Sequence, residues 1–201
     1  MQSESLYKDV TGVILAGGRS RRMGKDKTML EIGGITLFDR ALRMMRELFS
    51  EVLIAGDRKD LVRPGVCCYP DLFPGSALGG LYTGLMKSHH DMIFVCSCDM
   101  PSPNVNIARL VVSQDYAYDV VVPRTPDGLE PLFARYHKRC LPAMKDMLDR
   151  QKFRIYDFYP RVRMRYLDVT ELPADWQNSF LNINTPEEYN RIKEGNWQTL
   201  L

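Results

Sequence analysis

The segment from Val13 to Lys27 reads VILAGGRSRRMGKDK, and its two halves differ sharply in chemistry. An apolar run ends in two glycines, Gly17 and Gly18, and five cationic side chains follow within nine residues. Glycines let backbone N–H groups approach phosphate oxygens, while the cations offset the negative charge. The segment therefore predicts a buried strand leading into a loop that holds a polyphosphate, in preference to a merely solvated basic turn.

This loop fits neither of two common phosphate-binding patterns. It lacks the Gly-Lys-Ser/Thr ending of a Walker A loop. Its glycines at positions 17, 18 and 24 also miss the Gly-x-Gly-x-x-Gly spacing of dinucleotide-binding loops. The sequence therefore favours a nucleotide or phosphate site of a third kind.

The composition is that of an ordinary globular domain. The chain has 201 residues, 45% hydrophobic and 26% charged, and we expect a single domain over 1–201. A net charge of +2 is too small for a general nucleic-acid binder, whereas the local clustering of cations favours a small anionic ligand. The chain contains no apolar run of about 18 residues and starts with a polar segment, so no membrane span and a cytoplasmic location are expected. The five cysteines are interpreted as reduced core thiols in preference to a zinc site.

Strand and helix patterns alternate along the chain, which predicts an α/β fold with a largely parallel central sheet. The expected strands share short apolar runs that end at turn residues, and they cover 12–16, 52–55, 66–69, 92–97, 119–123, 132–136 and, as an edge strand, 164–169. The expected helices show apolar residues at helical spacing, and they cover 37–49, 77–88, 104–114 and 141–150. A last helix starts at Thr185, which with Glu188 forms a capping box, and stops at Gly195.

Three aspartates follow three of these strands directly. Asp57, Asp71 and Asp99 each stand just past a strand end. In open parallel sheets ligands bind beyond the carboxyl ends of the strands, so some of these side chains should face one cleft together with the basic loop. Mg²⁺ typically uses one or two carboxylates plus phosphate oxygens and waters, which makes Asp99 the candidate metal ligand. A simple turn or capping role is the alternative for Asp99, and more so for Asp71.

Two further segments are candidates for ligand contact. The segment 75–84 has four glycines around a helix start, which indicates close approach either by a ligand or by the sheet. Asn182 and Asn184 place two carboxamides on one face of a short expected strand, and these groups both donate and accept hydrogen bonds. No pattern indicates a covalent nucleophile, which favours direct transfer between bound phosphates, stabilised by positioning, cations and Mg²⁺.

The motifs together resemble one family. Leu15-Ala-Gly-Gly18, followed by Ser20-Arg-Arg-Met-Gly24 and Asp26-Lys27, resembles the start of nucleotidyltransferases, and the closest resemblance is to the molybdenum cofactor guanylyltransferases, the MobA family. The similarity extends over about 12–193. Its other motifs are Asp71, Pro74-Gly75, Cys96-Ser-Cys-Asp-Met-Pro101, Glu130-Pro-Leu132 and Asn182-Ile-Asn-Thr-Pro-Glu-Glu188.

The resemblance implies a Rossmann-like three-layer sandwich and transfer of GMP from Mg·GTP to molybdopterin, with release of pyrophosphate. It also implies contacts with other molybdenum cofactor biosynthesis proteins and recipient molybdoenzymes. The nucleotide positions that it implies are Leu15, Ala16, Gly17, Gly18, Lys27, Asp57, Asp71 and Asp99, with Asp99 on the metal. The pterin positions that it implies are Gly79, Gly80, Arg154, Asn182 and Asn184. Arg22 corresponds to a basic residue near both substrates, so the implied catalytic set is Arg22, Lys27 and Asp99.

The chain departs from the family pattern after the second strand, where members can carry an Asn contact to the nucleotide and this sequence reads Ala55-Gly-Asp57. A cytidylyltransferase for the same cofactor and a sugar-phosphate nucleotidyltransferase are the alternative enzymes. Related cytidylyl enzymes tend to read Leu-Ala-Ala-Gly, so Gly17 favours a purine by leaving space beside the base. A non-catalytic nucleotide-binding protein is disfavoured because both Lys27 and Asp99 are present.

Overall fold

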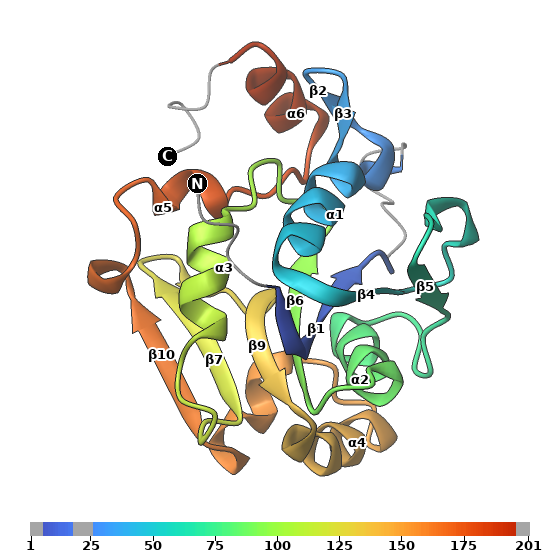
Figure 1. The fold of residues 1–201 in the computed structure, drawn as a ribbon, viewed down its shortest axis with the longest axis vertical. Helices are drawn as coiled ribbons and strands as arrows, with labels where there is room; N and C mark the ends of the chain where they lie inside the picture. The colour runs from blue at the N-terminus through green and yellow to red at the C-terminus, as the bar shows by residue number, and fades with distance from the viewer. Residues whose placement is uncertain (1–5, 18–25, 196–201) are drawn as a thin grey trace.

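A central sheet runs through the molecule in the computed structural model, which describes residues 6–17 and 26–195 (Figure 1). Its eight strands within that part of the chain are β1 (Tyr7–Leu15), β4 (Phe49–Ala55), β5 (Val66–Tyr69), β6 (Met92–Ser97), β7 (Val120–Thr125), β8 (Gly128–Leu129), β9 (Phe133–His137) and β10 (Met164–Asp168). The strand order is β10-β7-β9-β6-β1-β4-β5, and the short β8 pairs with β7.

Most neighbouring strands are parallel, as the alternating pattern predicts. β1 pairs in parallel with both β4 and β6, β4 with β5, and β10 with β7. β9 is inserted antiparallel between β6 and β7. The carboxyl ends of β1, β4, β5, β6 and β7 therefore lie at one edge of the sheet, which we call the carboxyl edge, and their starts lie at the opposite, amino edge.

Two helical layers cover the two faces of the sheet and give the predicted three-layer sandwich. Helices α1 (Leu37–Leu48) and α3 (Val105–Val112) pack with one buried cluster, together with residues next to the short α5 (Trp176–Ser179). Helices α2 (Ala77–Lys87) and α4 (Leu141–Asp149) pack with the other cluster. Short 3-10 turns connect these elements, namely η1 (Lys27–Met29), η2 (Lys59–Leu61), η3 (Lys138–Cys140), η4 (Ile155–Arg161) and η5 (Val169–Glu171).

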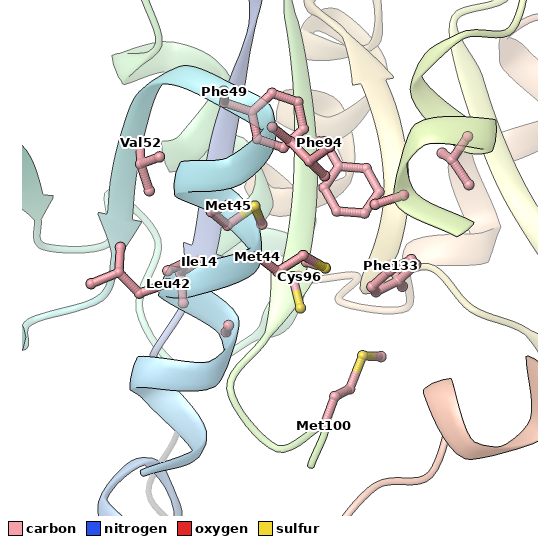
Figure 2. Close-up of a cluster of buried hydrophobic side chains, with 14 of the residues drawn as sticks. Ile14, Leu42, Met44, Met45, Phe49, Val52, Phe94, Cys96, Met100 and Phe133 are labelled. Carbon is pink, nitrogen blue, oxygen red and sulfur yellow. The ribbon is translucent and has the colours of Figure 1, made fainter. Parts of the chain in front are cut away.

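Aromatic rings fill the core beneath α1 (Figure 2). The Phe94 ring stacks on Phe49 at 5.7 Å and meets Phe133 edge-on at 4.9 Å between centroids. Gly12 makes room for this packing, since a Cβ at that position would lie 2.7 Å from the Phe49 ring. Each buried ring contributes roughly 1.5–3 kcal/mol through apolar burial, so this packing holds α1 and the central strands rigidly together.

The last helix closes the structure over a small hairpin. Strands β2 (Glu31–Ile32) and β3 (Ile35–Thr36) lie beside α6 (Pro186–Lys193), as Figure 1 shows. A third buried cluster joins them and includes Ile32, Ile183 and Ile192. Helix α6 begins with the predicted capping box, in which the Glu188 backbone N–H donates to the Thr185 hydroxyl at 3.2 Å. This cluster brings the segment before α6 next to the segment after the basic loop.

The structure corrects several sequence-based boundaries. The strands at 66–69 and 92–97 agree fully, whereas β1 and β4 begin earlier than expected because their first residues pair with each other. The short strand expected at 182–184 does not form, since this segment has no neighbouring ladder and its Ile183 N–H instead bonds the Asp99 carbonyl at 3.0 Å. None of the helices in the described part of the chain combines the length and apolar character that a membrane crossing requires.

Candidate functional site

Lys27 and Asp99 meet at the carboxyl edge of the sheet. Lys27 is the first residue of η1, and its Nζ lies 3.9 Å from Asp99 Oδ2. The same ammonium donates a hydrogen bond to Asn184 Oδ1 at 2.8 Å. The last cation of the basic segment, the aspartate after β6 and an asparagine before α6 thus converge from three distant parts of the sequence.

Asp99 is held by the segments on either side of it. The Ser97 hydroxyl donates to Asp99 Oδ1, and the Asp99 carbonyl accepts from the Ile183 N–H. The carboxylate keeps 27% of its side-chain surface exposed, so it remains accessible to a ligand. Because β6 is a central and fully buried strand, the backbone that carries this carboxylate is held rigidly.

The segment 182–184 is anchored by its middle residue, Ile183. Ile183 is fully buried in the cluster under α6, which places Asn182 and Asn184 on the two sides of it. Asn184 reaches Lys27, and its own N–H bonds Glu188 at 2.6 Å. Asn182 donates instead to the Phe180 carbonyl at 3.2 Å. The two asparagines therefore have different surroundings, although the sequence pattern predicts that they share one face of a strand.

A cavity of about 140 Å³ is connected to Asp99 through Ser97, which lines the cavity and donates to the Asp99 carboxylate. Its lining combines strand ends, the first loop and the start of α2, and consists of Leu15, Gly17, Ala55, Asp71, Gly75, Ser76, Ala77, Gly80, Ser97 and Leu132. Ligand pockets that enclose a whole drug-sized molecule measure roughly 300–1,000 Å³. This cavity is therefore suited to one part of a nucleotide.

Two glycines are required where the first loop meets the turn after β4. A Cβ on Gly17 would lie 2.7 Å from Asp71 Oδ2, which is closer than real contacts allow. Gly56 has a φ of 139°, and a Cβ there would lie 2.8 Å from the Gly17 nitrogen. Side chains at either position would displace the backbone or the Asp71 carboxylate. Gly17 therefore keeps Asp71 at the cavity wall.

Asp71 is an unsatisfied carboxylate. Its Oδ1 is buried and has no hydrogen-bond partner among the described residues. Burial raises the pKa of Asp71 from 3.8 to about 6. A buried oxygen without a donor is costly unless a ligand supplies one, so this group is a candidate for ligand recognition.

Glu130 is a second carboxyl group with a raised pKa near the site, and the sequence-based interpretation quotes it only as part of a motif. It follows β8, and its N–H bonds the Pro123 carbonyl at 3.0 Å. Burial, followed by the charges of Asp127 and Asp99, raises the pKa of Glu130 to about 7. The charge of Asp99 therefore contributes to the raised pKa of Glu130. The spacing of the two residues in the sequence does not predict this interaction.

The remaining predicted residues have mixed placements. Leu15 and Gly80 line the cavity, and Ala16 is buried with its N–H on the Ala55 carbonyl at 3.0 Å. Gly79 has a clear packing role, since a Cβ there would lie 1.8 Å from the Phe73 carbonyl oxygen.

Asp57 and Arg154 are exposed, and neither belongs to the lining of the cavity. Gly18 and Arg22 lie outside the described residues. The predicted nucleotide and pterin contacts of all these residues stay predictions.

Comparison with known proteins gives consistent results. The family model described as "MobA-like NTP transferase domain" matches residues 12–162. A "Probable molybdenum cofactor guanylyltransferase" of Pelotomaculum thermopropionicum is 41% identical over 182 residues, which covers 89% of each chain.

Two solved structures share the fold. The molybdopterin-guanine dinucleotide biosynthesis protein A of Archaeoglobus fulgidus superposes with a TM-score of 0.79 at 23% identity, covering 92% of this chain and 97% of that one. A manganese complex of Rv0371c from Mycobacterium tuberculosis has a TM-score of 0.67 at 20% identity, covering 93% and 98%.

Proposed function

This chain belongs to the molybdenum cofactor guanylyltransferases of the MobA-like NTP transferase family, and we propose that its substrates are GTP and molybdopterin. Membership of the family makes it a nucleotidyltransferase that acts in molybdenum cofactor biosynthesis. GMP passes to the terminal phosphate of molybdopterin and pyrophosphate leaves. We assign this reaction to a single domain formed by the whole chain. The meeting of Lys27, Asp99 and Asn184 at the carboxyl edge carries the proposal.

The arrangement suits transfer between two phosphates. A phosphate nucleophile is already anionic at neutral pH, so it needs no general base, and catalysis depends on positioning and charge stabilisation. Lys27 supplies a cation held between two oxygen ligands, which fixes its ammonium before the triphosphate arrives. Backbone amides at Gly17 and Gly18, with Arg22, are proposed to hold the remaining phosphate charge.

Asp99 is proposed to hold Mg²⁺ together with the triphosphate. The donor set fits this metal, because one accessible carboxylate flanked by a hydroxyl leaves the other positions to phosphate oxygens and water. Among the described residues no three Cys, His, Asp or Glu side chains gather around one point. When bound, the ion neutralises charge on the phosphate that is attacked. The manganese complex of a structural relative is consistent with a divalent metal here.

Asp71 is proposed to select guanine. The N1–H and N2–H₂ groups of guanine both donate, and an ionised carboxylate offers two acceptors for them. Its unsatisfied buried oxygen at the wall of a small cavity matches that need. The corresponding edge of cytosine offers N3 and O2 as acceptors, which an ionised Asp71 would repel. This argument adds to the steric one at Gly17 and favours GTP over CTP.

The pterin is proposed to bind near Asn184, which contacts Lys27. Resemblance to the family also assigns Asn182, Gly79, Gly80 and Arg154 to the pterin. Gly80 lines the cavity beside Asp71, so it is proposed to lie where the two substrates approach each other. Asp57 and Ala16 are retained as nucleotide contacts on the same basis. A carrier protein for molybdopterin and recipient molybdoenzymes are the expected partners.

Pyrophosphate release tests the proposed function. The full chain is supplied with molybdopterin, Mg²⁺ and either GTP, CTP or ITP. We expect release with GTP, much less with ITP because inosine lacks the 2-amino donor, and least with CTP. Preference for CTP would identify a cytidylyltransferase, and absence of release with every nucleotide would favour a non-catalytic binding protein.

A further inference from the structure

Arg58 makes an unusually complete set of polar contacts just past β4. Its Nε and Nη2 form a fork on the Asp60 carboxylate at 2.9 and 2.7 Å. Its Nη1 donates to Asp26 Oδ1 at 3.2 Å, and its Nη2 donates to the Thr28 hydroxyl at 2.9 Å and lies 2.7 Å from Asp26 Oδ2. Only 18% of this side chain is exposed. The guanidinium is therefore fixed by Asp60 on one edge and by Asp26 and Thr28 on the other.

Two of these partners flank Lys27 directly. Asp26 is the N-cap of η1, and its Oδ1 accepts from the Thr28 N–H at 3.1 Å and from the Thr28 hydroxyl at 2.7 Å. Lys27 lies between them and points its ammonium towards Asp99 and Asn184. Arg58, from the turn after β4, thus holds the side chains of the two residues on either side of the lysine, and we call this group of contacts the clamp.

One guanidinium faces two carboxylates in this group of contacts. Hydrogen bonding to Asp60, with further help from Asp26, raises the pKa of Arg58 above its usual value. Asp60, Asp26 and Thr28 accept four hydrogen bonds from the five donors of the guanidinium, which therefore serves these side chains rather than a phosphate. Arg58 also offsets part of the Asp26 charge, which would otherwise repel a triphosphate close to Lys27 more strongly.

We propose that Arg58 is a positioning residue for guanylyl transfer, which fixes Asp26 and Thr28 and thereby holds the Lys27 ammonium beside Asp99. This inference rests on the proposed function for its kinetic consequence. Its structural consequence, an immobilised Lys27, is independent of the substrate. A planar five-donor fork is required at this position, because a lysine cannot bridge Asp26, Thr28 and Asp60 at once.

A double-mutant cycle separates positioning from general structural support. The kcat and the KM for GTP are measured for the full chain and for Arg58→Ala, Lys27→Ala and the double variant. Because a misplacement of about 1 Å can cost about 10²-fold in rate, Arg58→Ala should lower kcat by about 10- to 100-fold. In the Lys27→Ala background the same change should lower kcat less than about 3-fold, since coupled residues are not additive.

Two further variants sharpen the cycle. Arg58→Lys keeps the charge but loses the fork, and it should behave like Arg58→Ala. Arg63→Ala is the matched control, because Arg63 belongs to the same connection but pairs with Asp39 at 3.5 Å and lies over the Phe38 ring. It should leave kcat within about 2-fold, as expected for a surface ion pair. Equal losses from Arg58→Ala in both backgrounds, or a rise in KM alone that Arg58→Lys repairs, would overturn the proposal.

A measurement without substrate keeps the inference testable even if the proposed function fails. Acylation of Lys27 by acetic anhydride is followed by mass spectrometry in the free protein. Release of Lys27 from its contacts in Arg58→Ala should change its labelling rate several-fold, with no change in Arg63→Ala. Unchanged labelling in Arg58→Ala would contradict the clamp, whereas wild-type protein that releases no pyrophosphate would contradict only the proposed function.

Discussion

The pKa values of several buried or half-buried carboxyl groups shift in opposite net directions at the two edges of the central sheet, whereas the more exposed Asp60 and Asp168 at the carboxyl edge pair with arginines and have lowered pKa values. At the amino edge, just before β7, burial alone would raise the pKa of Asp119, but hydrogen bonds from Arg163 and Arg139 lower it to about 2. Glu51, near the start of β4, also has a lowered pKa, because hydrogen bonds from Thr11 and His89 outweigh its burial. At the carboxyl edge burial prevails, and the pKa of Asp71 rises to about 6.

The difference shows which edge supports the fold and which is adapted to ligands. Ion pairs and hydrogen bonds stabilise the charged carboxylates of the amino edge, so these groups contribute to folding. Asp71 and Glu130 at the carboxyl edge are left with raised pKa values, which is typical of functional sites. At neutral pH the ionised forms of these two groups therefore lower the free energy of unfolding at the edge where substrates are expected to bind.

The largest expected effect comes from the carboxyl edge. Asp99→Asn keeps the shape of the side chain but removes its charge, so it should lower kcat for pyrophosphate release by at least about 10³-fold. Thermal unfolding should change little, because Asp99 is partly exposed and its backbone bond to Ile183 is retained. Near-wild-type turnover at saturating Mg²⁺ would exclude Asp99 as the metal ligand.

Asp71→Asn tests the cost of the unsatisfied carboxylate. The folded pKa lies above the unfolded one, so ionisation of Asp71 destabilises the fold as pH rises through the range from 3.8 to about 6. A pKa raised by this amount corresponds to about 3 kcal/mol. The stability of Asp71→Asn relative to wild type should therefore increase by up to that amount between pH 4 and pH 7.5, as measured by urea unfolding.

The same variant should lose guanine selectivity, because a neutral amide no longer offers two acceptors. The wild-type KM for GTP should also rise as pH falls below about 6, where Asp71 becomes protonated. Asp57→Asn, at an exposed position past the neighbouring strand, serves as the control for the stability measurement. A selectivity for GTP over ITP that survives in Asp71→Asn would contradict its assignment to the base.

At the amino edge, Asp119→Asn should destabilise the fold at neutral pH, whereas Asp71→Asn should stabilise it. The folded pKa is depressed, so the stabilisation is present above pH 3.8 and disappears as pH falls towards about 2. The loss at pH 7 should be about 1–2 kcal/mol, because Arg139 and Arg163 are 40% and 58% exposed and solvent screens their charges. Urea unfolding at pH 7 and pH 3 measures it, and an equal loss at both values would show that the charge is not responsible.

The smallest effect is expected for His89, whose ring contacts Glu51 but is 84% exposed. His89→Ala should change the free energy of unfolding by less than about 0.5 kcal/mol, as for other exposed pairs. Thr11→Val is its buried counterpart, since the Thr11 hydroxyl donates to Glu51 from a fully buried position and its loss should cost about 1 kcal/mol. Comparable losses for both variants would show that exposure does not rank the contacts of Glu51.

Local patterns in the sequence were sufficient for most of the fold. The apolar run at 92–97 and the capping box of Thr185 and Glu188 predict β6 and the start of α6 correctly, because short-range packing and capping decide them. The strand at 132–136 was predicted, but its antiparallel direction as β9 and the β2–β3 hairpin were not, since strand direction and two-residue pairings depend on distant neighbours. For the same reason Ser97 and Arg58 have no local signature, although Ser97 contacts the predicted site residue Asp99 and Arg58 contacts Asp26, the residue before the predicted Lys27.

The sequence by itself determined the alternation of strands and helices, the basic loop after the first strand and the aspartates at strand ends, because each depends on neighbouring residues and a fixed period. Only the tertiary structure decided which of these groups meet. It placed Lys27 beside Asp99 and Asn184 and left Asp57 exposed. The physical reason is that burial and partners, which set the charge state of a carboxylate, come from segments far apart in the chain.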